Sequence, residues 1–140
     1  MTNDEKLNKF MRNWDSYWGR GEVAHTEFIR HIVSSYLEAG IEYVDKPASV
    51  QNVVAFLNVA SKAYWTKPID LSEAADNWNT ALDSITQDPK NDISELMCLV
   101  YTVMRGGSVT AMSAIRKITR KSWRPDITVW DLMCEVPIFF

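Results

Sequence analysis

The sequence has few of the residues that build covalent, metal or membrane frameworks. It holds two cysteines and two histidines in 140 residues. Two cysteines do not suffice for the disulfide framework of a small secreted domain or for a multi-cysteine zinc site. The longest apolar runs, 96–104 and 53–60, fall far short of the roughly 20 residues that cross a bilayer. The sequence therefore predicts neither a disulfide scaffold nor a membrane span.

Glycine and proline are also scarce, with five of each, and no stretch is rich enough in them to form a linker between domains. No internal repeat occurs at a fixed period. A domain of this size buries roughly two thirds of its unfolded surface, so it needs no metal or disulfide for stability. We predict a single domain over 1–140 with an apolar tail at 136–140. The polar N-terminus lacks the apolar core of a secretory signal and favours the cytoplasm.

Apolar residues recur at steps of three and four along most of the chain, which is the spacing of one face of an α-helix. The segments with this spacing are 2–18, 22–39, 50–64, 70–86, 92–104 and 108–123, followed by a short one after 126. We predict an all-α fold, a compact single-domain bundle of about six or seven short helices. Residues 41–49 are predicted as a connection rather than a strand. Residues with capping side chains are placed at the expected helix starts: Thr2, Ser49, Asp70, Asp92, Ser108 and Asp126.

Charge is unevenly distributed along the chain, whose net charge is -3. Residues 1–100 hold nine basic and fifteen acidic side chains, whereas 101–140 hold six and three. The most specific polar feature is a basic face on the helix over 108–124, made of Arg116, Lys117, Arg120, Lys121 and Arg124. This face is suited to a phosphate backbone or another anion. Two other interpretations stay open: a solvated face, or an internal match to the acidic stretch 70–95.

That acidic stretch is the second charged feature, with seven acidic residues and one lysine. Its candidate partner-binding residues form one side of the helix over 70–86: Asp70, Glu73, Asp76 and Asp83. Such a face would suit a positively charged partner surface and would speed the encounter with it.

The histidines and cysteines form no catalytic or metal-binding pattern. His25 and His31 are six residues apart on one predicted helix, so they face different ways and cannot hold one metal ion together. Cys98 and Cys134 are predicted to be buried thiols. The chain has no strained-turn nucleophile motif and no phosphate-binding glycine loop. We therefore predict no catalytic, cofactor or metal site and do not expect an enzyme.

Six tryptophans are many for this length. Three of them sit at predicted helix ends and are candidate aromatic anchors in an interface, because rigid rings bury much area at little entropic cost: Trp18, Trp65 and Trp123. The alternative is that each ring packs a helix end. The apolar tail poses the same choice between folding back on the core and docking into a partner or a second copy.

These features together favour a small acidic helical module that binds a protein partner stoichiometrically and regulates or inhibits it, as immunity, anti-defence or adaptor proteins do. The analogy is one of size and composition, not of motif. The alternative function is a nucleic-acid-associated regulator that uses the basic helix over 108–124.

Overall fold

The computed structural model describes residues 2–18, 23–64, 88–105 and 108–136. They form six helices: α1 (Asn3–Trp18), α2 (Val23–Ala39), α3 (Val50–Tyr64), α5 (Pro89–Arg105), α6 (Val109–Ser122) and α7 (Val129–Glu135). This part of the chain contains no β-strand, so the all-α prediction is confirmed. The helix predicted over 70–86 lies outside the described residues.

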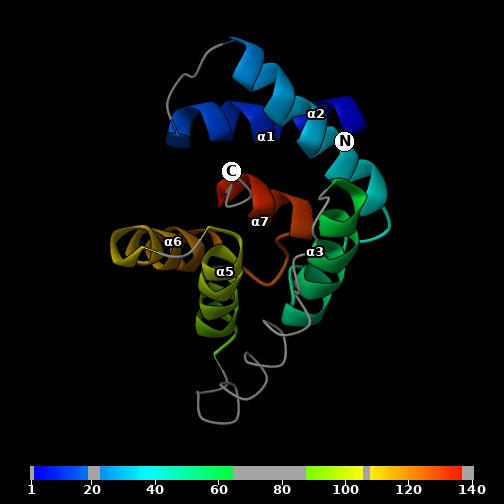
Figure 1. Cartoon of the computed structure of the whole chain (residues 1–140). Helices are drawn as coiled ribbons and strands as arrows, with labels where there is room; N and C mark the ends of the chain where they lie inside the picture. Colours follow the sequence, from blue (N-terminus) through cyan, green and yellow to red (C-terminus); the bar gives the residue numbers. More distant parts are fainter. Residues whose placement is uncertain (1, 19–22, 65–87, 106–107, 137–140) are drawn as a thin grey trace.

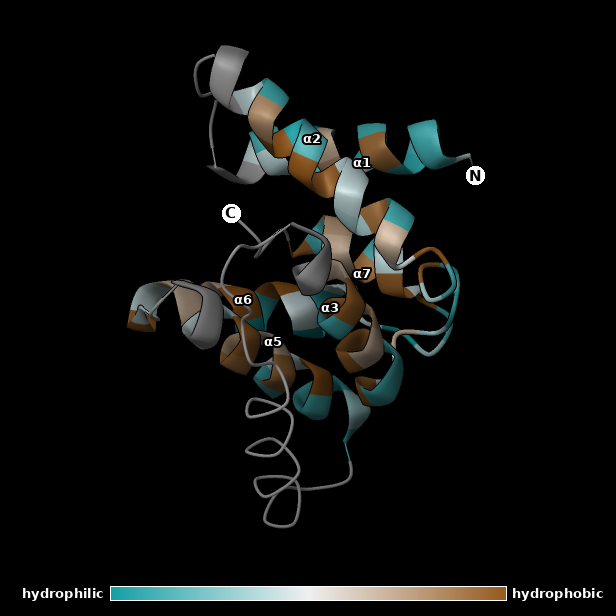
Figure 2. Ribbon diagram, turned by 45° about the vertical axis from the view of Figure 1, so that its right-hand side comes forward, coloured by the Kyte–Doolittle hydropathy of each residue, from teal (hydrophilic) through white to brown (hydrophobic). Residues whose placement is uncertain are grey.

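The short helix α7 lies at the centre of the arrangement, with α1 and α2 on one side and α3, α5 and α6 around the rest (Figure 1). It packs against α1, α3 and α6, while α2 packs on α3 and α5 on α6. Hydrophilic residues (teal) and hydrophobic residues (brown) alternate along α2 and α6 in Figure 2, as expected of helices with one buried face.

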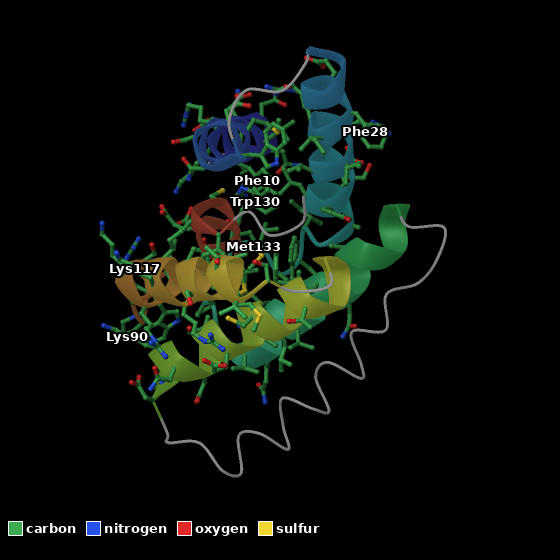
Figure 3. All side chains as sticks on the ribbon, turned by 60° about the vertical axis from the view of Figure 1, so that its left-hand side comes forward. Phe10, Phe28, Lys90, Lys117, Trp130 and Met133 are labelled. Atoms are coloured by element: carbon green, nitrogen blue, oxygen red, sulfur yellow. The ribbon has the colours of Figure 1, made fainter. Side chains whose placement is uncertain are left out.

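Trp130 of α7 is buried in the hydrophobic core and is only 1% exposed. Its ring centroid lies 5.7 Å from that of Phe10 on α1 and 6.1 Å from that of Phe56 on α3, the latter edge to face. Figure 3 shows Phe10 and Trp130 together between α1 and α7. Trp14 of α1 is also buried. Three helices far apart in sequence thus converge on one indole ring.

Three predicted helix caps are confirmed by hydrogen bonds from backbone N–H groups to capping hydroxyls. Thr2 accepts from Glu5 at 3.2 Å, Ser49 from Asn52 at 3.2 Å and Ser108 from Ala111 at 3.4 Å. Each bond satisfies an N–H that has no partner within its helix.

Two predicted caps are wrong. The helix expected to begin at Asp92 begins at Pro89, and Asp88 caps it by accepting from the N–H of Lys90 at 3.0 Å. Proline at the first helical position costs nothing, because its missing N–H would have no intrahelical partner. The last helix is capped by Thr128, which accepts from the N–H of Asp131 at 3.1 Å, and not by Asp126.

The connection between α2 and α3 pairs with the segment that leads into α7. We refer to these paired segments, 44–48 and 127–130, as the clasp. Three backbone N–H groups donate across it: Ala48 to Ile127 (2.8 Å), Val129 to Lys46 (2.9 Å) and Trp130 to Val44 (3.0 Å). Residues 41–49 therefore form a connection, as predicted, with one isolated β-bridge between Pro47 and Thr128.

Candidate functional site

The α5–α6 pair carries the charged surface that the sequence singles out. The inner face of α6 buries Ile115 and Thr119. The Cys98 thiol of α5 donates to the backbone oxygen of Met112 at 3.6 Å, and the Thr102 hydroxyl of α5 lies 3.8 Å from the Met112 sulfur. These contacts hold α6 against α5 along one side and leave the opposite side of α6 exposed.

Arg116, one of the five predicted basic-face residues, is engaged within the pair. Its Nε donates to Glu95 Oε1 at 2.8 Å and its Nη2 to Glu95 Oε2 at 3.3 Å. The hydrogen bond from this guanidinium to Glu95 raises the pKa of Arg116. Since Glu95 belongs to the acidic stretch 70–95, the internal match weighed from the sequence is present at this one position.

Lys117, Arg120 and Lys121 are exposed on the outer side of α6. Within the described ranges, none of these three side chains forms an ion pair. Arg124 lies just beyond the helix and pairs with Asp126 at 3.2 Å, with both side chains more than half exposed. A pair so open to water contributes little. The basic face is therefore one internally paired arginine and three exposed cations, with a loosely paired fifth.

Lys90 adds a cation that the sequence argument did not include. It is exposed at the start of α5, and its side chain projects on the same side of the α5–α6 pair as Lys117 (Figure 3). The antiparallel course of the two helices brings the beginning of α5 to the end of α6. A lysine some 30 residues away in sequence joins the basic face only through this tertiary arrangement.

The four predicted acidic-face residues lie outside the described residues, as does Trp65: Asp70, Glu73, Asp76 and Asp83. Trp18 is the last residue of α1, and its side chain is also outside the described part. Trp123 is partly buried and donates its indole N–H to the backbone oxygen of Ala48 at 3.1 Å. This contact ties the end of α6 to the clasp. Of the apolar tail only Val136 is described, and it is buried.

The two cysteines are buried, as predicted. Burial raises the pKa of Cys98 to about 11 and that of Cys134 to about 12, so both stay protonated near neutral pH and neither is a reactive thiolate. His31 is exposed, and the side chain of His25 lies outside the described part. Among the described residues, no three His, Cys, Asp or Glu side chains come close enough to hold a metal ion.

Two surface pockets are lined mainly by polar side chains. One, of about 380 Å³, lies along α1 beside Glu5, Asn8, Lys9 and Arg12. The other, of about 290 Å³, is lined by Asn13, Ser16, Ile118 and Glu135. In the first, Lys9 is already held by Asp131 at 2.9 Å. The pocket thus leaves Arg12 and Glu5, of opposite charge, as its remaining ionic groups.

No helix in the described ranges has the length and apolar character needed to cross a membrane. No protein-family model, curated protein or solved structure matches the chain. A function for this chain therefore has to follow from its own residues, among which the exposed side of α6 is the most distinctive.

Proposed function

We propose that this chain is a cytoplasmic binding module that contacts a protein partner stoichiometrically and regulates or inhibits it. The observation that carries the proposal is the arrangement of α6, whose inner face is fixed in the core while Lys117, Arg120 and Lys121 stand exposed outside. Exposed charges of one sign attract a complementary surface, speed the encounter and fix its orientation.

The exposed side of α6 is positively charged, whereas the predicted partner-binding face over 70–86 is negatively charged. Because Asp70, Glu73, Asp76 and Asp83 lie outside the described residues, a partner with a basic surface stays a prediction from the sequence. The side chains of α6 favour a partner surface that carries carboxylates.

Affinity capture of the tagged chain from its native cytoplasm, with nuclease treatment and mass spectrometry, tests the proposed function. We expect one protein to be retained in near-equal amount, with no change after nuclease. Retention of nothing, or only of nucleic acid and proteins that nuclease releases, would count against a stoichiometric protein-binding module.

The second candidate is a nucleic-acid-associated regulator, favoured by the same three exposed cations. Its binding would depend on counterion release, so the affinity for a short DNA duplex or RNA strand would fall steeply with salt. Reversal of Lys117, Arg120 and Lys121 to glutamate would abolish it. Fluorescence anisotropy at two salt concentrations separates this function from the first.

A further inference from the structure

We propose that the outer face of α6 docks an acidic helix of the protein partner, whose carboxylates are spaced one turn apart. This inference rests on the proposed function and names the surface and the partner chemistry. The α6 outer face comprises the exposed residues of the helix: Val109, Thr110, Ser113, Lys117, Arg120 and Lys121.

The six residues form one continuous surface. At about 100° per residue they lie within an arc of roughly 120°, and the centre of that arc is nearly opposite the buried Ile115 and Thr119. The face is convex and runs the length of the helix, which suits side-by-side contact with another helix better than capture of a small ligand.

The spacing of its cations matches carboxylates on a helix. Lys117 and Lys121 are four residues apart, or about 6 Å along the helix axis. Acidic side chains at positions i and i+4 of a partner helix are separated by a similar distance. Two such carboxylates therefore reach both lysines together, with Arg120 on the same exposed face. The side chain of Lys90 projects on the same side as that of Lys117 (Figure 3).

The other end of the face is neutral. Val109 is 83% exposed, the highest value among the large hydrophobic residues in the described part of the chain, and Thr110 and Ser113 follow it. An apolar side chain on a partner helix could cover Val109, whereas a phosphate backbone offers nothing apolar to this position. The combination of a neutral end and a basic end favours protein over nucleic acid.

Acidic residues bound the basic end of the face. Asp88 is exposed next to Lys90, and Asp126 is exposed just after α6. A nucleic-acid strand continuing past the basic turns would meet these carboxylates. A helix with a few glutamates makes the favourable contacts within one or two turns and need not extend further.

The test uses a synthetic helical peptide with glutamates at i and i+4 and a leucine further along the same face. Its control is the same peptide with glutamine in place of glutamate. Titration of the isotope-labelled protein by NMR reports both affinity and location. We expect amide shifts along α6 and near Lys90, and binding weakened about tenfold or more for the glutamine peptide.

A charge-reversal variant, Lys117→Glu with Lys121→Glu, should bind the acidic peptide at least about tenfold more weakly. The matched control is Arg12→Glu with Lys46→Glu, which changes the net charge equally at exposed positions on other elements. It should bind like the natural protein. Circular dichroism checks that both variants keep their helices.

Three outcomes would overturn the inference: shifts spread over all exposed basic residues, equal binding by the charge-reversal variant, or tighter binding of a short DNA duplex than of the peptide at physiological salt. Failure of the proposed function is distinguishable. If the natural chain and Lys117→Glu with Lys121→Glu capture the same protein from cytoplasm, the protein-binding function stands and the α6 outer face is not the contact.

Discussion

The clasp and the α5–α6 pair differ in how far apart in sequence their contacting residues are. The clasp joins segments about 80 residues apart through backbone hydrogen bonds, and the indole N–H of Trp130 adds a bond to the Lys6 carbonyl, 124 residues away, at 2.9 Å. The α5–α6 pair consists of neighbours in sequence whose ion pair, Glu95 with Arg116, spans 21 residues. The clasp is held by contacts between distant segments, whereas the α5–α6 pair keeps one exposed face.

Because of this difference, we expect the clasp to determine the stability of the fold and the α6 outer face to be available for binding. Contacts across the clasp bury Trp130 and bring α1, α3 and α7 into one core, so loss of any of them is felt throughout the fold. Substitutions on the α6 outer face touch no core side chain. A surface can therefore be tuned for a partner there without loss of the fold.

The largest effect is expected from Trp130→Ala, which removes the ring shared by three helices. Loss of a fully buried tryptophan typically costs about 3–5 kcal/mol in the free energy of unfolding, and the Lys6 carbonyl also loses its donor. Urea unfolding followed by circular dichroism measures the change. A loss below about 1 kcal/mol would show that the clasp side is not the stabilising region.

A smaller effect is expected from Gly40→Ala at the end of α2. A Cβ atom at Gly40 would clash with Cδ2 of the Phe56 ring, which is fully buried. Overpacking of this kind costs about 1–3 kcal/mol. The matched control is Ala39→Gly, at the exposed neighbouring position, where the cost should be about 1 kcal/mol or less. Thermal unfolding compares the two variants.

Most of the fold follows from local patterns in the sequence. Apolar spacing predicts each of the six described helices, and three of the expected caps are confirmed. The error at Asp92 arose because Asp92 and Glu95 mimic a capping box, while Asp88 followed by Pro89 is the stronger start. The error at Asp126 has a non-local cause, because Thr128 is extended where it pairs with Pro47 in the clasp, and α7 begins only at Val129.

The sequence predicts which residues of α6 form the basic face, but not which of them are paired or which other cations lie near them. Helical periodicity places Lys117, Arg120 and Lys121 on one side of α6. That Arg116 pairs with Glu95, and that Lys90 stands beside the face, depends on the antiparallel register of two helices. Periodicity within one helix carries no information about that register.

A moderate effect is expected from Glu95→Gln, which weakens the ion pair on the rim of the α5–α6 pair. Both side chains are about one third exposed, so the loss should be about 0.5–1 kcal/mol and should shrink at high salt. A double-mutant cycle with Arg116→Gln isolates the coupling between the two side chains. A coupling near zero would mean that core contacts alone hold α6 in place.

The smallest effect, of opposite sign, is expected from Asp92→Asn in the first turns of α5. Burial, together with the charge of Asp88, raises the pKa of Asp92 above its ordinary value of 3.8, and its Oδ1 is buried with no hydrogen-bond partner in the described part of the chain. A carboxyl whose pKa is raised on folding stabilises the fold while protonated, and this contribution is lost as the pH rises through the folded-state pKa.

At pH 7 the charged Asp92 side chain therefore lowers the free energy of unfolding, and asparagine at this position should raise it by about 0.5 kcal/mol or less. Below the ordinary pKa the carboxyl is neutral in both states, so the gain should vanish in acid. Unfolding curves at neutral and acidic pH measure this difference, and a variant less stable at pH 7 would show that attraction between Asp92 and the α5 N-terminus outweighs its burial.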